Sequence, residues 1–143
     1  DNFFISYRKT KLKKGQFVHS IRIPLFEDNT FKAYKVSKRF DDDISSVCAA
    51  FNIEIVKNRI QNVRIAYGGM AAIPKRAIYC EKILLNSLVT EEIIYRAKKA
   101  LEKDFKPISD MRASRLYRME VAKNLLEKCC AEIKQKKLIG VYF

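Results

Sequence analysis

The sequence predicts an α+β fold, a two-layer sandwich in which a mainly antiparallel sheet of about four strands is followed by three helices packed on one face. Apolar residues recur at every second position as far as Gly68-Gly69, and at about every 3.6 positions after it. The strand patterns follow one another without the strand–helix alternation of a parallel sheet. The chain has 143 residues, of which 48% are hydrophobic, enough for the core of one domain.

Two strands are expected before a charged segment at residues 38–43. The first covers residues 17–25, where isoleucine or leucine alternates with polar residues and Pro24. The second covers residues 30–37 and carries apolar side chains on both faces. We therefore expect both faces of the second strand to meet apolar partners.

A hairpin is expected next. Apolar and polar residues alternate over residues 47–55 and again over residues 60–67. The polar tip Lys57-Asn58-Arg59 separates the two runs, and Gly68-Gly69 ends the second one. These patterns predict the third and fourth strands of the sheet.

Three helices are expected after the hairpin. Pro74 suits the first turn of a helix that ends near Leu85. Thr90 is a typical capping residue, and the helix that follows it should end before Pro107. Asp110 is expected to cap the longest helix, which covers residues 111–136. Its predicted inner stripe consists of Tyr117, Val121, Leu125, Cys129 and Ile133.

The net charge of +13 is the strongest compositional feature. A basic surface can attract phosphate backbones or acidic partners. Basic residues are nevertheless spread through every predicted element, and no nucleic-acid-binding motif is present. No run approaches the roughly 20 apolar residues of a membrane span, and no signal-peptide pattern opens the chain. We therefore expect a cytoplasmic protein with no membrane contact and no specific nucleic-acid partner.

Candidate catalytic and metal-binding residues are few. The four cysteines form no CxxC pair, so we expect free thiols rather than a metal or iron–sulfur site. His19 is the single histidine, and it falls within a predicted strand without a candidate nucleophile beside it. A catalytic triad is therefore not expected, because a general base needs a partner that orients the imidazole.

The densest group of charged side chains is segment 34–44, which holds three basic residues and three adjacent aspartates between two predicted strands. Such side chains can hold the polar edges of a cofactor, because Lys and Arg donate to oxygen atoms while Asp accepts from ring N–H groups. A solvated turn whose charges neutralise one another explains the same pattern. Residues 68–70 match no phosphate-binding fingerprint and predict a tight turn.

Four motifs together resemble a known family. They are YRKT at residues 7–10, SKRFDDDI at 37–44, GGMA at 68–71 and SDMRASRLYR at 109–118. In this order they resemble the C-terminal segment of the FAD-binding domain of bacterial xanthine dehydrogenases, which are molybdenum hydroxylases. This segment is similar in fold to the C-terminal domain of carbon monoxide dehydrogenase flavoproteins.

The resemblance implies particular cofactors and partners. In this family a molybdenum centre hydroxylates a purine, iron–sulfur clusters relay the electrons, and FAD passes them to NAD. Residues 1–16 would lead in from a preceding FAD lobe, residues 17–137 would form the domain, and residues 138–143 would be a tail. The expected partners are the preceding FAD lobe and the iron–sulfur domain of the same polypeptide, and a molybdopterin subunit.

The resemblance also implies which residues meet the cofactor. Lys35 would touch the flavin, and the charged loop that follows would lie beside the flavin ring. Arg39, Asp42, Asp43 and Ile44 would then tune the ring and shape the access of NAD. Because the family's glycine-rich pyrophosphate segment belongs to the preceding lobe, we expect the isolated chain to bind FAD weakly and to be inactive.

Two alternative functions stay open at this point. The chain resembles the corresponding segment of a carbon monoxide or aldehyde dehydrogenase flavin subunit as well, and the substrate is chosen at the molybdenum centre. The net charge is also compatible with a basic binding module for nucleic acid or for an acidic protein.

Overall fold

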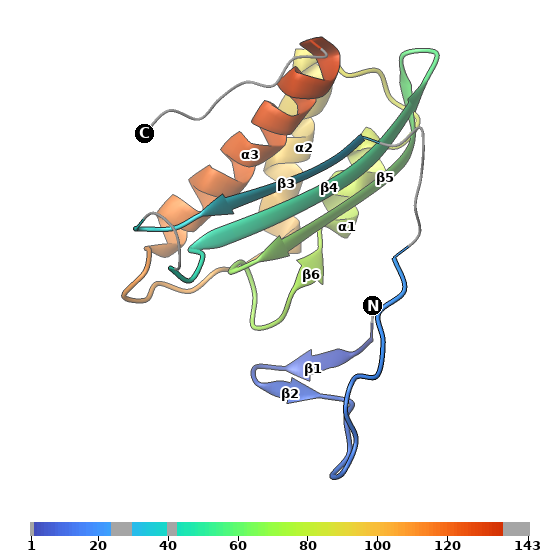
Figure 1. The fold of residues 1–143 in the computed structure, drawn as a ribbon. Coiled ribbons are helices and arrows are strands. Elements are labelled where there is room, and N and C mark those ends of the chain that lie inside the picture. The colour runs from blue at the N-terminus through green and yellow to red at the C-terminus, as the bar shows by residue number, and fades with distance from the viewer. Residues whose placement is uncertain (1, 24–29, 40–42, 136–143) are drawn as a thin grey trace.

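A four-stranded antiparallel sheet and three helices make up most of the chain (Figure 1). The computed structural model describes residues 2–23, 30–39 and 43–135. The sheet has the order β3 (Thr30–Val36), β4 (Val47–Val56), β5 (Arg59–Gly68) and β6 (Lys75–Arg76). The helices are α1 (Ile78–Leu84), α2 (Glu91–Asp104) and α3 (Arg115–Gln135), and β1 (Phe4–Ser6) and β2 (Lys9–Thr10) form a separate two-stranded sheet. The three helices lie on one side of the larger sheet, which confirms the predicted α+β fold.

The predicted hairpin is confirmed by β4 and β5. Its tip is a two-residue turn in which Lys57 and Asn58 have positive φ angles of 49° and 62°. Alternation along the two strands places one set of side chains under the helices. In β4, every second residue from 47 to 53 is at most 1% exposed.

A row of aromatic rings joins the sheet to the helices. Tyr67 packs edge-to-face against Phe51 and Phe105, with ring centroids 5.9 and 5.3 Å away. Its hydroxyl donates a hydrogen bond of 2.9 Å to the carbonyl of Ala122 in α3. The buried phenol is therefore satisfied, and it fixes the distance between β5 and α3.

The strand predicted at residues 17–25 is wrong over its described part, residues 17–23. Phe17 and Ile21 there are 77% and 80% exposed. A period-two pattern marks an apolar face but supplies no neighbour for the backbone to pair with. Among the described strands β3 pairs with β4 alone, and the fourth place in the sheet belongs to β6. Residues 24 and 25 lie outside the described residues.

The first helix begins at Ile78 instead of near Pro74, because residues 75–76 pair with β5 as β6. The carboxylate of buried Asp104 accepts hydrogen bonds of 2.9 Å from the amides of both Tyr79 and Cys80. These bonds satisfy two of the free N–H groups at the start of α1. Local sequence could not show this start, because the capping carboxylate comes from the far end of α2.

The second helix agrees with the sequence analysis. The hydroxyl of Thr90 accepts a hydrogen bond of 3.3 Å from the amide of Ile93, as expected of a capping residue. Helix α2 ends at Asp104, before Pro107. The predicted cap and end are therefore confirmed.

The third helix begins at Arg115, later than predicted, and Asp110 is not its cap. The hydroxyl of Ser114 accepts a hydrogen bond of 3.2 Å from the amide of Tyr117, so Ser114 caps the helix. Asp110 instead closes a turn before it, accepting from the amides of Arg112 and Ala113 at 2.9 and 3.1 Å. Asp and Ser are both good capping residues, so the sequence alone does not rank them.

The inner stripe of α3 is also partly different from the predicted one. Leu125 and Cys129 are buried as expected, but Tyr117 is 49% exposed. The buried residues of this helix are Arg118, Ala122, Leu125, Leu126, Cys129, Cys130 and Glu132. The inner stripe therefore starts with a charged residue, which an apolar pattern leaves out.

No described helix is long and apolar enough to cross a lipid bilayer.

Candidate functional site

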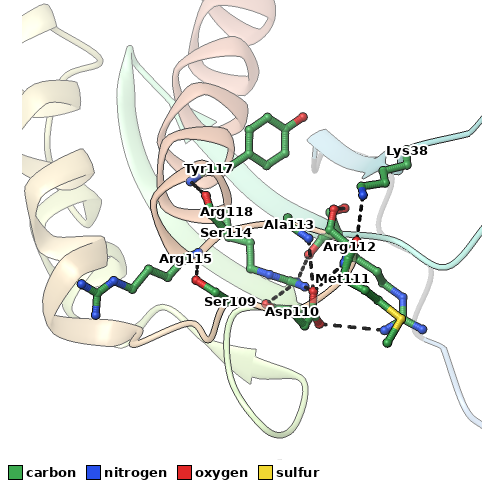
Figure 2. Close-up of polar contacts among 12 residues, drawn as sticks. Lys38, Ser109, Asp110, Met111, Arg112, Ala113, Ser114, Arg115, Tyr117 and Arg118 are labelled. Atoms are coloured by element: carbon green, nitrogen blue, oxygen red, sulfur yellow. Dashed lines mark hydrogen bonds and ion pairs between the residues drawn. The ribbon is translucent and has the colours of Figure 1, made fainter.

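One end of the larger sheet brings together the segments that the sequence analysis singled out. Strand β3 ends there, β4 begins there and β5 ends there at Gly68. We call the described residues between β3 and β4, 37–39 and 43–46, the charged loop. The ammonium of Lys38 donates a hydrogen bond of 2.7 Å to the carbonyl of Met111, which brings segment 105–114 to the same end (Figure 2).

The sheet face opposite the helices, here the open face, carries small side chains at this end. Two cross-strand rows on it are Ala33–Ala50–Ala66 and Lys35–Cys48–Gly68. Side chains at positions two apart in a strand share a face, so the rows lie side by side. No described helix covers them, and Lys35 and Cys48 are exposed. These two rows therefore form a shallow patch of small groups with Lys35 at its loop end, and the next row along the open face is Phe31–Asn52–Arg64.

The described part of the charged loop is closed by its own hydrogen bonds. The hydroxyl of Ser37 donates to the carbonyl of Arg39 at 2.8 Å. The carboxylate of Asp43 accepts from the amides of Arg39 at 3.2 Å and of Ile44 at 2.9 Å. Desolvation raises the pKa of Asp43, but these amide bonds and the nearby arginines outweigh it, so the pKa lies below its ordinary value. Asp43 is therefore a carboxylate at neutral pH.

Arg118 joins three of the segments at this end. Its Nη1 donates to the carbonyl of Ser46 in the charged loop, and to the carbonyl of Gly69 at 3.0 Å. Its Nη2 donates to the carboxylate of Asp110 at 2.6 Å. Figure 2 shows Asp110 between Arg118 and Arg112, and the side chain of Arg115 directed away from them. The guanidinium thus ties the loop, the turn after β5 and segment 105–114 together.

A pocket of about 540 Å³ opens beside this junction. Its wall comes from the charged loop, the turn after β5, segment 105–114, Arg118 and Tyr7. Ile44 lines it and is 63% exposed. Lys106, Arg112 and Asp110 also line the pocket, so its wall carries cations and one carboxylate. A volume of this size suits part of a cofactor or a small ligand.

Comparison with known proteins identifies the family. The CO dehydrogenase flavoprotein C-terminal domain matches residues 32–133, which is most of the chain. This chain belongs to that family. The matched range includes β4, β5, β6, α1, α2, the charged loop and most of β3 and α3.

Relatives of this flavoprotein domain occur in several oxidoreductases. The glyceraldehyde dehydrogenase medium chain of Sulfolobus acidocaldarius is 30% identical over 132 residues, which are 92% of this chain and 47% of that protein. The xanthine dehydrogenase of Emericella nidulans is 36% identical over 107 residues, or 72% of this chain and 8% of that protein. The chain thus spans less than half the length of either relative.

A solved structure shares the fold. The carbon monoxide dehydrogenase of Hydrogenophaga pseudoflava, in a form lacking the Mo-pyranopterin moiety, matches with a TM-score of 0.82 and 23% identity. The match covers 88% of this chain and 44% of that one. The strands-then-helices architecture inferred from the sequence is therefore that of the CO dehydrogenase flavoprotein C-terminal domain.

The predicted flavin-contacting residues do not form one cluster in this domain. Arg39 and Asp43 form an ion pair with Nε and Oδ2 3.8 Å apart, and Ile44 lines the pocket. Lys35 lies instead on the open face. Asp42 falls outside the described residues. The assignment of these residues to flavin contact therefore stays a prediction.

The role of Arg118 was not predicted, although the residue belongs to the motif at residues 109–118. Its helical position was the available signal. Arg118 lies four residues before Ala122 and on the same helix face as Leu125, so it is a charged residue in phase with the apolar stripe. Such a residue is buried only with partners, which here are two carbonyls and a carboxylate.

Of the cysteines only Cys48 belongs to this site, and His19 does not line the pocket. No disulfide joins the four cysteines, and Cys48 is the exposed one. Burial raises the pKa of Cys129 and of Cys130 to about 12, so these two are inert thiols. His19 is exposed and lies outside the strands, which corrects its predicted place within a strand.

Asp110 should make the stability of the domain depend on pH. Hydrogen bonds from the amides of Arg112 and Ala113, and then from Arg118, lower its pKa from 3.8 to about 2. Stability from a lowered carboxyl pKa is present above the ordinary value and is lost as the pH falls through the folded one. We expect Asp110→Asn to lose less stability than the wild type between pH 4 and pH 2, measured by urea unfolding at each pH. Equal losses in both proteins would contradict this.

Proposed function

We propose that this chain is the C-terminal part of the flavin domain of a xanthine dehydrogenase, where it forms one wall of the FAD site and part of the path to NAD. Family membership supports the flavoprotein part of the proposal. The observation that carries the location is the open face. Its flat rows of small side chains end at Lys35, next to the charged loop and the pocket.

The open face fits a planar ring. Alanine, cysteine and glycine side chains leave a shallow surface, and stacked rings need such a surface on at least one side. The ammonium of Lys35 would donate to a carbonyl or anionic nitrogen at the ring edge. FAD, when bound, would supply the two-electron chemistry.

The charged loop would act on the polar edge of the ring and on the pocket mouth. Asp43 is ionised, because its pKa is lowered, and can accept a hydrogen bond from a ring N–H. Ile44 presents an apolar side chain at the pocket, where it would keep water away from the ring.

NAD is the electron acceptor in this proposal, and the pocket is its candidate site. Arg112 is partly exposed there and Lys106 is exposed, so both can approach a ligand. Two cations beside a pocket of about 540 Å³ suit the pyrophosphate of a dinucleotide. The wall from the charged loop would bring the ligand next to the residues assigned to the flavin.

The remaining parts of the enzyme would lie outside residues 1–143. The exposed apolar side chains of residues 3–23, among them Phe17, Ile21 and Ile23, suit a surface that packs against a preceding FAD lobe. Iron–sulfur clusters and molybdopterin would belong to other domains or subunits. The free thiols support a cytoplasmic location, where cysteines stay reduced.

Xanthine is the proposed substrate of the whole enzyme, because the xanthine dehydrogenase of Emericella nidulans is 36% identical to this chain. An aldehyde is the second candidate, since the glyceraldehyde dehydrogenase medium chain matches over 92% of this chain. Turnover of the assembled enzyme with xanthine and with glyceraldehyde would separate the two.

FAD titration tests the division of the flavin site between two lobes. The chain has four glycines and no glycine-rich phosphate loop, so the phosphates of FAD would lack donors here. We expect the longer flavin subunit to bind FAD stoichiometrically, and residues 1–143 alone to bind it weakly, as measured by flavin fluorescence. Circular dichroism of the isolated chain provides the control for folding.

Two results of this titration would count against the proposal. A flavin subunit that binds no FAD would contradict the flavin function. A submicromolar, stoichiometric complex of FAD with residues 1–143 would contradict the need for a second lobe.

A further inference from the structure

Arg118 is a buried cation at the junction of three segments that the chain keeps far apart in sequence. It is 3% exposed and belongs to the first turn of α3. Its three acceptors come from the charged loop at Ser46, from Gly69 after β5, and from Asp110. The planar fork of a guanidinium can serve several acceptors in fixed directions at once, which a lysine ammonium cannot do in the same geometry.

The charged loop is fastened to segment 105–114 at both ends. Near its start, Lys38 donates to the carbonyl of Met111 at 2.7 Å. At its end, the hydroxyl of Ser46 donates to the carbonyl of Arg112 at 3.4 Å, and Arg118 holds the carbonyl of Ser46. The described parts of the loop thus rest on segment 105–114, and this segment is held by Arg118 through Asp110 (Figure 2).

Stability alone is a poor explanation for this arrangement. The Nε atom of Arg118 is buried and has no hydrogen-bond partner among the described residues. A buried charge with one unpaired donor costs free energy that an apolar side chain in the same place would not. An arginine whose burial is unfavourable in free energy is instead suited to fixing the relative position of its partners.

We propose that Arg118, supported by Asp110, is a positioning residue that sets the place of the charged loop relative to the flavin and to NAD. The inference rests on the proposed function, because it needs FAD beside the loop. Arg118 lies in the pocket wall, but its Nη1 and Nη2 donate to Ser46, Gly69 and Asp110, so it acts through the Ser46 carbonyl and segment 105–114. A displaced loop would move Ile44 and Asp43, and with them the wall between the flavin and the pocket.

The test compares two electron acceptors in the assembled enzyme. NAD reduction requires a correctly placed hydride acceptor, whereas ferricyanide takes single electrons and needs no such placement. In Arg118→Lys, NAD-linked turnover per bound FAD should fall at least about tenfold through kcat, because small displacements of reacting groups are costly. Ferricyanide-linked turnover per bound FAD should stay at the wild-type value.

Asp110→Asn and Arg115→Lys complete the design. Asp110→Asn keeps the shape and the oxygen that accepts the amides, but it weakens the contact with Arg118, so it should lower the NAD-linked rate in the same direction by less. Arg115 is exposed on the same helix turn, directed away from Asp110, and Arg115→Lys should change neither rate (Figure 2).

The outcomes separate the inference from the function on which it rests. A fall in the NAD-linked rate alone supports the positioning role. The positioning role would be overturned if the ratio of the NAD-linked to the ferricyanide-linked rate stayed unchanged in both Arg118→Lys and Asp110→Asn, whether or not both rates fell. A wild-type enzyme that holds no FAD would instead contradict the proposed function.

Discussion

Replacing Gly69 with alanine is expected to destabilise the domain by about 3–4 kcal/mol, the upper range for a single substitution. Gly69 has a φ angle of +80°, which L-residues rarely adopt. A Cβ atom there would lie 2.3 Å from the carbonyl oxygen of Ser46 and 3.0 Å from Nη1 of Arg118. The backbone strain and the clash act together, and both would disturb the Arg118 junction that holds the charged loop. Urea unfolding followed by circular dichroism would measure the loss.

Two glycines of the same chain provide matched controls. Gly15 has a similar φ of +82° with nothing within 4 Å of its Cβ position, so Gly15→Ala isolates the cost of the backbone angle, about 1–2 kcal/mol. Gly68 meets only Cβ of Cys48 at 3.6 Å, an ordinary contact, so Gly68→Ala should change stability little. If Gly69→Ala cost no more than Gly15→Ala, the close approach of the loop to the turn would be contradicted.

The elements defined by their own local pattern were predictable. The hairpin of β4 and β5 alternates strictly and carries polar residues at its tip, so its two strands were placed to within about a residue. In helix α2, Thr90 marks the cap, and Pro107 indicates that the helix ends before it. In both cases the information lies within the segment itself.

The elements that depend on distant partners were not predictable. Residues 17–23 have a strand-like pattern without a neighbouring strand, and β6 forms because β5 offers an edge. The start of α1 depends on Asp104, which caps it from the end of another helix. Propensity and periodicity describe a segment, whereas these features are set by tertiary contacts.

The candidate site divides in the same way. The charged loop and the motif at residues 109–118 were visible in the sequence, but their contact through Lys38 and Arg118 was not. The apolar stripe predicted for α3 left Arg118 out because its side chain is charged. A basic binding module, the other hypothesis from the net charge, stays untested, and a salt-dependent nucleic-acid shift assay would test it.

Replacing Lys35 with alanine is expected to weaken FAD binding to the full flavin subunit by about 10- to 100-fold. Lys35 stands at the end of the open face, and a charge-assisted hydrogen bond to the ring edge would be lost with its ammonium. The fold should be unaffected, because the side chain is exposed. Lys103→Ala is the control, since Lys103 is an exposed lysine of α2, in the helix layer on the other side of the sheet.

The FAD dissociation constants of these two variants and of the wild-type subunit, from flavin fluorescence, test most directly whether the open face meets the flavin. If this chain is the flavin wall, Lys35→Ala binds FAD about 10- to 100-fold more weakly and Lys103→Ala binds like the wild type. Equal dissociation constants for all three proteins would contradict a flavin site at Lys35.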